Sequence, residues 1–176
     1  VNFWYPMAAS DELTDQPHKV RCMGLDFVLF RDAEGQARCL SNTCIHRGGS
    51  LAGGKIQGDG IACPYHGWEF DGDGTCHNIP SLGRDAMIPA RARLDAYEVQ
   101  EKYGIIFAFL GDLSREERSP LLEVAEDGQD GWRLTMQHFE LGCNYQRSVE
   151  NGLDPAHNEF VHDTHGFQGE NEAYKV

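Results

Sequence analysis

The stretch Cys44–Trp68, CIHRGGSLAGGKIQGDGIACPYHGW, contains two cysteine–histidine pairs. Cys44 and His46 are separated by one residue, and Cys63 and His66 are separated by two. Each pair lies in a segment rich in glycine, and glycine allows a backbone to turn tightly around a ligand. Thiolate sulfur and imidazole nitrogen both bind zinc, and both bind iron in some iron–sulfur centres. The stretch therefore predicts a metal site formed by two loops, each of which supplies one cysteine and one histidine.

The composition is that of an acidic globular protein. The chain has 176 residues, of which 40% are hydrophobic, so it can form one domain or one domain plus part of another. Its formal net charge of −13 argues against nucleic-acid or anionic-membrane binding, because both require basic surfaces. No apolar run reaches the ~20 residues of a transmembrane helix, and the first residues do not resemble a signal peptide. Four of the six cysteines lie outside the pairs without a pairing pattern, which favours a reducing, cytoplasmic compartment.

The sequence up to Asp112 predicts short β-strands. Alternating or apolar runs separated by glycine turns predict a β-meander over residues 18–42 and a hairpin over residues 55–62. Ile105–Leu110 is continuously apolar, which predicts a strand buried on both faces. Near the start of the chain, Pro6 permits an edge strand but not a central one.

The composition changes after Asp112. Residues 114–131 are polar and acidic and predict a linker. Residues 133–143 alternate as a strand does, and residues 144–162 have a helical pattern in which Pro155 can occupy a first turn. We therefore divide the chain into a first domain at 1–113, a linker at 114–131 and the beginning of a second domain at 132–176.

The donor set alone leaves two kinds of metal open. A tetrahedral zinc ion takes two cysteines and two histidines, but zinc fingers usually keep the like residues together. A [2Fe–2S] centre can also take two histidines in place of two cysteines on one iron. The mixed pair in each loop and the many glycines favour iron. Tyr65 or Ser50 could donate a hydroxyl hydrogen bond to a thiolate, or could serve only in packing and turns.

Together these motifs resemble the Rieske domain of the Rieske non-haem iron oxygenases. The resemblance covers residues 3–112 and includes WYP, DFVLFRD, CIHRGG, GDGIACPYHGWEFD and YGIIFAFLGD. It implies an all-β Rieske domain of antiparallel sheets with two cluster-binding loops, followed by the start of an α+β catalytic domain. By this resemblance Cys44 and Cys63 hold one iron of the cluster, and His46 and His66 hold the other. The loops lack the additional cysteines that form a disulfide in the Rieske proteins of respiratory chains.

A second motif combines Asp154, His157 and His162. Asp154 and His157 share a helix face, whereas His162 lies about 140° away from His157 at roughly 100° per residue. Both histidines can reach one ion only if the helix is irregular or ends near Val161. By themselves these residues are weak evidence for a metal site, because two histidines near an aspartate are more often ordinary surface or core residues.

The sequence ENGLDPAHNEFVH, which contains these residues, resembles the iron motif of the same oxygenases. The resemblance implies that His157 and His162 bind a mononuclear Fe(II), and that Asp154 bridges to a cluster histidine of a neighbouring subunit in a homotrimer. The family takes its third iron ligand, a carboxylate, from far downstream, and this sequence has no matching residue. Glu159, Glu170 and Glu172 do not stand at that position, and we interpret His165 as a loop residue.

The resemblance implies the terminal oxygenase component of a multicomponent enzyme. Electrons from NAD(P)H arrive through a separate flavin reductase, a ferredoxin or both. The oxygenase then uses O₂ for the hydroxylation or oxidative demethylation of an organic, aromatic substrate, as a monooxygenase or a dioxygenase. The alternatives are a ferredoxin-like Rieske electron carrier without catalysis and a zinc-stabilised interaction protein.

Overall fold

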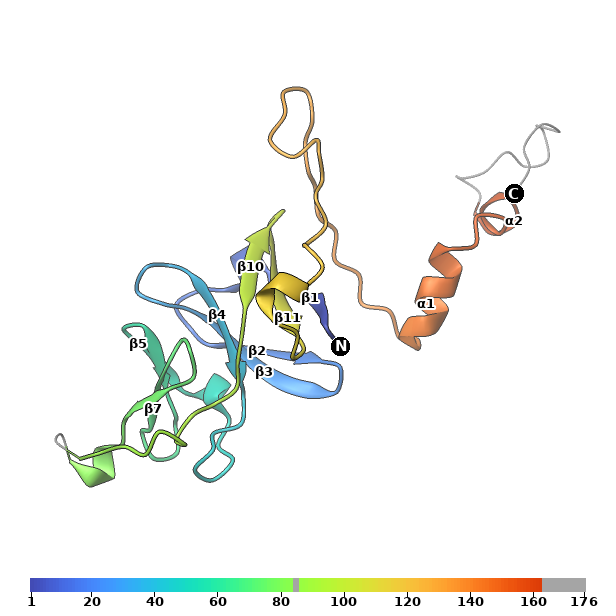
Figure 1. Cartoon of the computed structure of the whole chain (residues 1–176). Coiled ribbons are helices and arrows are strands. Elements are labelled where there is room, and N and C mark those ends of the chain that lie inside the picture. The colour runs from blue at the N-terminus through green and yellow to red at the C-terminus, as the bar shows by residue number, and fades with distance from the viewer. Residues whose placement is uncertain (84–85, 163–176) are drawn as a thin grey trace. The chain divides into compact units, whose positions relative to one another are not determined.

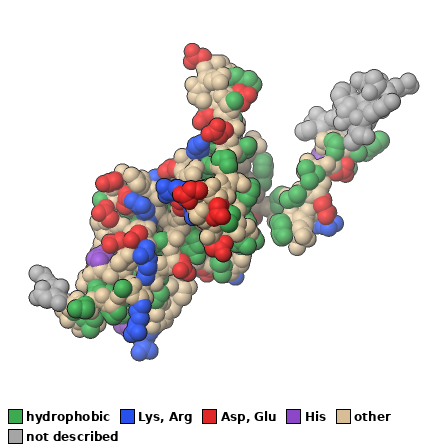
Figure 2. All heavy atoms as spheres, viewed as in Figure 1, with side chains coloured by type: hydrophobic (Ala, Val, Ile, Leu, Met, Phe, Trp, Pro, Cys, Tyr) green, Lys and Arg blue, Asp and Glu red, His purple; other side chains and the backbone are tan. Residues whose placement is uncertain are grey.

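The computed structural model describes residues 1–83 and 86–162, which belong to two compact units. The first unit, Val1–Leu134, contains every strand of the described chain, and the second begins at Thr135. Three small antiparallel sheets make up the first unit (Figure 1). Acidic and basic side chains are interspersed over the visible face of this unit (Figure 2). No helix in the described ranges is long and apolar enough to cross a membrane.

The first sheet joins the two ends of the first unit. Its strand order is β1–β11–β10, with bounds Phe3–Ala9 for β1, Ile105–Leu110 for β11 and Val99–Lys102 for β10. The central strand β11 is buried at four positions and half-buried at the other two, which confirms the prediction from its apolar run. β1 lies at the edge, and its register shifts just after Pro6. An edge position tolerates this proline, because the missing N–H is not needed for a second partner.

The second sheet is the predicted meander. Its strands follow the order β2–β3–β4–β9, with bounds His18–Cys22, Leu25–Arg31, Ala37–Ser41 and Ala96–Tyr97. Successive strands pair antiparallel, as short glycine turns require. Phe27 and Leu29 of β3 point into one core cluster while Val28 and Phe30 point into another. β3 is thus buried on both faces and connects the two cores.

The third sheet carries the metal-site stretch. Its strands follow the order β5–β6–β7–β8, with bounds Lys55–Gln57, Gly60–Ala62, Glu69–Asp71 and Cys76–Asn78. Phe70, Ile61 and Leu51 are fully buried in the core beside this sheet, and Cys44 and Cys63 belong to the same core. The two glycine-rich loops therefore start from a packed base. Single-turn 3-10 helices lie at Ser10–Glu12, Leu51–Gly53, Pro80–Leu82 and Arg115–Glu117.

Residues 113–124 contact the first sheet. The Trp4 indole N–H donates to the Ser119 carbonyl at 3.0 Å, and the Arg118 guanidinium lies 4.2 Å from the centre of the Phe109 ring. The Tyr103 hydroxyl donates to the Leu122 carbonyl at 3.0 Å. A cation over an aromatic face contributes about 0.5–2 kcal/mol, depending on its exposure. The first part of the predicted linker segment is thus fastened to the sheet.

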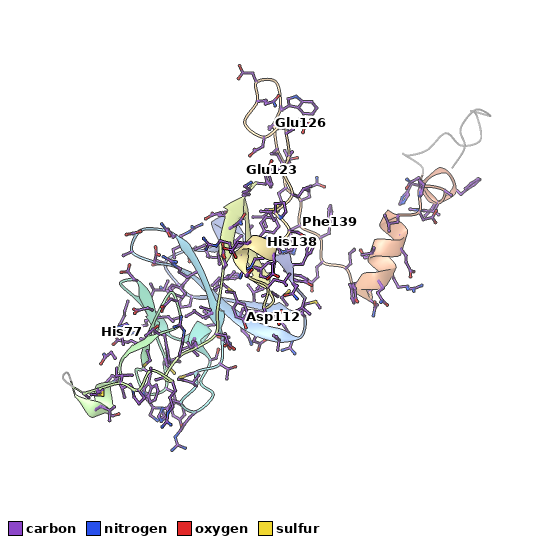
Figure 3. The ribbon with its side chains drawn as sticks, in the orientation of Figure 1. His77, Asp112, Glu123, Glu126, His138 and Phe139 are labelled. Atoms are coloured by element: carbon purple, nitrogen blue, oxygen red, sulfur yellow. The ribbon has the colours of Figure 1, made fainter. Side chains whose placement is uncertain are left out.

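The second unit contains two short helices within its described part. α1 is Tyr145–Gly152, capped by the Asn144 side chain, which accepts from the Gln146 N–H at 2.9 Å, and α2 is Asn158–Val161. The prediction of a strand at residues 133–143 is wrong, because the structure has no strand there. Its side chains are exposed, including Phe139, which is labelled in Figure 3. An alternating segment forms a strand only when another backbone pairs with it, and no described segment does so.

Asp32 holds the turn between β3 and β4 and provides a test of the fold. Its side chain is 2% exposed and accepts hydrogen bonds from Arg38 Nε at 2.7 Å and from the Gln36 N–H at 2.8 Å. Burial alone would raise the pKa of Asp32, but these hydrogen bonds outweigh it and lower the pKa. A depressed pKa stabilises the fold above the unfolded value of about 3.9, and this stabilisation is lost as the pH falls through the folded pKa.

We expect Asp32→Asn to lower the free energy of unfolding by about 2 kcal/mol at pH 7, because it leaves the partly exposed Arg38 without its ion pair. The difference from the wild type should shrink at acid pH. Urea denaturation at pH 7 and at pH 3 measures both values. Asp59→Asn, at an exposed position of the β5–β6 turn, is the matched control. Equal losses in the two variants would contradict the role of Asp32.

Candidate functional site

The first loop is closed by backbone hydrogen bonds around Cys44. The Cys44 N–H donates to the Gly49 carbonyl at 2.9 Å, and the Gly48 N–H donates back to the Cys44 carbonyl at 2.8 Å. Gly48 has a φ of +70°, which glycine adopts without strain. Buried Asn42 fixes the base of the loop, since its Oδ1 accepts from the Ala52 N–H at 2.8 Å. The Ser50 hydroxyl lies within 3.2 Å of the same oxygen, so its role is to support the loop.

The second loop repeats this arrangement around Cys63. The Cys63 N–H donates to the Trp68 carbonyl at 2.8 Å, and the Gly67 N–H donates to the Cys63 carbonyl at 3.0 Å. Gly67 has a φ of +71°, which matches the first loop within a degree. In both loops the glycine stands four residues after the cysteine, and the closing carbonyl stands five residues after it. The two loops are thus local copies of one hydrogen-bonded frame.

The two thiols are buried and close together. Cys44 is 2% exposed and Cys63 is 4% exposed. Burial, with a further contribution from the neighbouring Cys63 thiol, raises the pKa of Cys44 to about 11. A Cβ placed on Gly49 would lie 3.1 Å from the Cys63 sulfur, so the two loops meet at this point. A buried thiol pair is suited to a metal, whose binding displaces the thiol protons.

The two imidazoles form the other half of the site. The ring centroids of His46 and His66 are 4.6 Å apart. His46 Nδ1 is buried and has no hydrogen-bond partner within the described residues, although a buried polar atom normally has one. Burial, followed by repulsion from His66, lowers the pKa of His46. Lowering this pKa favours the neutral imidazole, which is the form that binds metals.

The donor set fits a two-iron cluster. In a Rieske [2Fe–2S] centre two cysteines coordinate one iron and two histidines coordinate the other, so each iron has only two protein ligands. The structure brings the thiols together and the imidazoles together, and within the described residues buried His46 Nδ1 has no hydrogen-bond partner. Within the described ranges, no group of three or more His, Cys, Asp or Glu side chains is placed to hold one metal ion. The arrangement by pairs is therefore compatible with the cluster.

The close approach of Gly49 to Cys63 leads to a prediction. We expect Gly49→Ala to lower the affinity for the cluster about tenfold, because the added methyl group would press on the Cys63 sulfur and on the Tyr65 side chain. Iron content per chain after reconstitution measures the effect. Gly53→Ala in the same loop is the matched control, since its Cβ would meet Pro64 at an ordinary 3.7 Å. Equal iron content in the two variants would contradict the close contact.

The second motif is arranged around α2. His157 precedes this helix and His162 follows it in an extended conformation, and their ring centroids are 5.3 Å apart. The sequence predicts that both histidines can reach one ion only if the helix is irregular or ends near Val161. In the structure the helix ends at Val161, so this condition is met. Asp154 lies outside both helices rather than on a shared helix face. Its Oδ2 is 3.8 Å from His157 Nδ1, and its backbone carbonyl is hydrogen-bonded to the same nitrogen.

The structure thus places the three residues of the second motif near one another without forming a complete metal site. His165, Glu170 and Glu172 lie outside the described residues. Two aromatic residues beside the first site have contacts that sequence reasoning missed. Trp68 stacks on His46 with ring centroids 4.5 Å apart and planes 6° apart, and Tyr65 lies 3.9 Å from His66, centroid to centroid. One sequence feature could have drawn attention to Trp68. It stands five residues after Cys63, just as Gly49 stands five residues after Cys44, so the two residues occupy the same position in the two loops.

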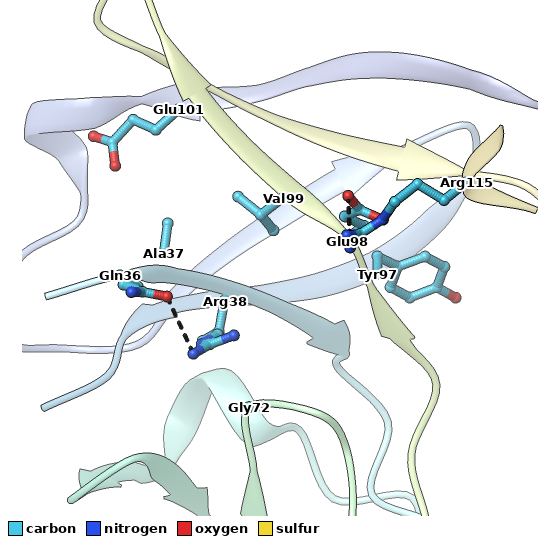
Figure 4. Close-up of a pocket in the computed structure, with 9 residues that line it drawn as sticks. All are labelled: Gln36, Ala37, Arg38, Gly72, Tyr97, Glu98, Val99, Glu101 and Arg115. Carbon is cyan, nitrogen blue, oxygen red and sulfur yellow. Dashed lines mark hydrogen bonds and ion pairs between the residues drawn. The ribbon is translucent and has the colours of Figure 1, made fainter. Parts of the chain in front are cut away.

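A separate pocket of about 380 Å³ lies on the first unit, lined in part by β4 and β10 (Figure 4). None of the cysteine or histidine donors lines it. Its charged side chains are satisfied by one another or by neighbours, as in the pairs Arg115–Glu98 at 3.1 Å and Arg31–Glu101 at 2.9 Å. The pocket therefore contains none of the predicted metal donors.

Comparison with known proteins agrees with this geometry. The family model of the Rieske [2Fe–2S] domain matches residues 3–98. The chain is 36% identical over 174 residues to the phenoxybenzoate dioxygenase subunit alpha of Ectopseudomonas oleovorans, covering 92% of this chain and 42% of the relative. It is 35% identical to the oxygenase component of 3-ketosteroid-9-alpha-monooxygenase from Rhodococcus rhodochrous, covering 90% of this chain and 43% of the relative. The chain thus spans less than half the length of these relatives.

A solved structure shows the same fold. NdmA of Pseudomonas putida CBB5 superposes with a TM-score of 0.86 at 25% identity, covering 97% of this chain and 50% of that one. The residues that match the family model, 3–98, include both cysteine–histidine pairs. The chain belongs to the Rieske [2Fe–2S] domain family, and the relatives that it matches include oxygenase components.

Proposed function

We propose that Cys44 and Cys63 hold one iron of a Rieske cluster, and that His46 and His66 hold the other. The observation that carries this assignment is the repeated loop frame, which presents a buried thiol pair and a neighbouring pair of imidazoles. When bound, the cluster accepts and passes on single electrons. The chain's own residues bury the two cysteines, lower the pKa of His46 and leave His66 exposed at the surface. This exposed edge supports electron entry there.

We further propose that the protein is the terminal oxygenase component of a Rieske oxygenase. In this proposal residues 1–113 are the Rieske domain, 114–131 the linker, and 132–176 the beginning of an α+β catalytic domain. His157 and His162 bind a mononuclear Fe(II), Asp154 bridges towards the cluster of a neighbouring subunit, and a carboxylate outside this sequence is the third ligand. The proximity of the two rings on either side of α2 supports this role.

The proposed partners follow from this role. An NAD(P)H-dependent flavin reductase, a ferredoxin or both supply electrons to a cytoplasmic homotrimer. The substrate is an organic, aromatic compound that undergoes hydroxylation or oxidative demethylation. The names of the relatives, which include dioxygenases and monooxygenases, support an oxygenase and leave the substrate class as our proposal. The net charge of −13 supports the absence of nucleic-acid and anionic-membrane partners.

An electron carrier without catalysis is the second candidate. One observation favours it: Val1–Leu134 form a compact unit that contains all four proposed cluster ligands. A carrier needs nothing beyond this unit. The second histidine motif has no purpose in such a protein, and for this reason we place the oxygenase first.

Iron content and spectroscopy test both proposals on the purified full-length protein. We expect a red-brown protein whose reduced form gives the EPR signal of a mixed cysteine–histidine cluster. An oxygenase should contain three irons per chain, whereas a carrier should contain two. A colourless protein that contains only zinc would overturn the cluster assignment and with it both candidates.

A further inference from the structure

We propose that Trp68 is a positioning residue for His46, whose imidazole it holds in a fixed plane for cluster binding. This inference rests on the proposed function, because His46 is one of the four cluster ligands named there. Trp68 itself supplies no donor atom to the metal. It belongs to the second loop, whereas the histidine that it orients belongs to the first.

The stack between the two rings carries the inference. The planes of Trp68 and His46 are 6° apart at a centroid distance of 4.5 Å, whereas His46 and His66 meet at 64°. The rotation of an imidazole about its Cβ–Cγ bond is broad and roughly two-fold when nothing restricts it. A flat ring in parallel contact restricts it, since tilting the imidazole would drive its edge into the indole. The stack therefore selects one plane for the His46 ring.

The indole is itself held firmly. The Trp68 carbonyl accepts the Cys63 N–H at 2.8 Å, so its backbone is tied to a proposed cluster ligand. Its half-buried side chain packs against the core that contains Phe70 and Ile61. Packed side chains lose rotational freedom, so the indole is a rigid support. Through Trp68, the second loop and the core together determine the orientation of a ligand from the first loop.

His46 and His66 differ in their aromatic support. A metal-binding histidine is commonly oriented through the ring nitrogen that does not bind the metal. His46 Nδ1 is buried without a hydrogen-bond partner within the described residues, so it is the nitrogen available to iron, and the stack with Trp68 acts on the plane of the ring as a whole. The aromatic neighbour of His66 is Tyr65, which is 62% exposed and tilted by 34°. The two histidines are thus supported unequally, and the close parallel support belongs to His46.

Two measurable consequences follow from this arrangement. The plane of a ligand ring affects the EPR g-values of the reduced cluster, so a free His46 ring should shift or broaden them. The face of an indole favours positive charge beside it, and therefore favours the more oxidised cluster. Removing the indole face should then move the midpoint potential in the positive direction.

The test compares Trp68→Phe with Trp68→Met in the full-length, iron-loaded protein. Both variants keep an apolar side chain against the core, but only phenylalanine keeps a flat aromatic face. We expect the phenylalanine variant to keep the wild-type g-values and potential, and the methionine variant to show shifted g-values and a more positive potential. Trp132→Met, at a 66% exposed tryptophan, is the matched control and should change neither value.

Each outcome either supports or overturns the role of Trp68. Identical values in the methionine and phenylalanine variants, or an equal shift in both, would overturn the role of Trp68. If the methionine variant takes up no iron, the phenylalanine variant decides alone: wild-type iron content and g-values support the inference, and their loss overturns it. The wild-type spectrum distinguishes failure of the proposed function from failure of the role of Trp68. A wild type without a mixed-ligand signal removes the proposed function, whereas a normal wild type with unaltered variants removes only the inference about Trp68.

Discussion

The His66→Ala variant is expected to lose the mixed-ligand cluster, together with its visible absorption and its EPR signal. The substitution would leave one iron with a single protein ligand, His46. Structural metal sites with four protein ligands gain about 10–16 kcal/mol on binding, so one ligand corresponds to roughly 3 kcal/mol, or about 100-fold in affinity. His66 is exposed and lies outside the core, so the fold itself should survive. Iron content, the visible spectrum and circular dichroism of the same sample measure both points.

His77→Ala is the matched control for this experiment. His77 lies on β8 (Figure 3), is exposed, and its two ring nitrogens face Asp71 at 2.8 Å and Glu69 at 3.2 Å. It is thus a histidine of the same unit that is engaged with carboxylates rather than with the paired loops. We expect this variant to retain both iron and colour. If His66→Ala kept the wild-type spectrum, His66 could not be a cluster ligand and the assignment of all four ligands would fail.

The sheets could be predicted because their signals are local. The turn glycines between residues 18 and 42 separate short runs, and each run became a strand that pairs with the next one along the chain. Pro6 restricted β1 to an edge for a reason that depends only on its missing N–H. The apolar run of β11 likewise required burial on both faces. None of these features requires knowledge of distant contacts.

The second unit was harder to predict for two physical reasons. Residues 133–143 alternate, but a strand is stabilised by a partner backbone, and alternation alone does not provide one. The helical pattern of residues 144–162 is interrupted between α1 and α2. Pro155 disfavours helical geometry at Asp154, the residue before it, so the chain turns there. This interruption moves Asp154 off the helix while keeping it beside His157.

The candidate donors could be named from the sequence, but the contacts that surround them could not. Cysteine and histidine are common metal ligands, so the two pairs could be recognised as candidate donors in the sequence. The common loop frame depends on hydrogen bonds between residues five apart, and only the glycines at 48 and 67 hinted at it. The stack of Trp68 on His46 joins two loops and becomes visible only when the chain is folded.

Asp154→Asn is expected to leave both proposed metals bound and to slow electron delivery to the proposed mononuclear iron roughly 10–100-fold. The substitution removes a negative charge and nearly preserves the shape of the side chain. Asp154 Oδ1 accepts the Ala156 N–H at 3.0 Å, a bond that an asparagine oxygen can keep, so the turn before α2 should remain. A proposed bridge between two imidazoles needs an acceptor on both sides, and an amide offers only one. Single-turnover kinetics of the full-length protein, with iron content measured in parallel, provide the test.

Glu150→Gln is the matched control, because it removes one negative charge from α1 without changing Asp154, His157 or His162. Glu150 is exposed and pairs with Arg147 at 2.7 Å on the same helix, a contact worth only a few tenths of a kcal/mol. We expect wild-type electron delivery in this variant. If Asp154→Asn turned over at the wild-type rate, the bridging role would be excluded even though His157 and His162 remained candidate ligands. If both variants were slow to the same degree, the cause would be the loss of charge on this unit, and the specific contact of Asp154 with His157 would carry no function.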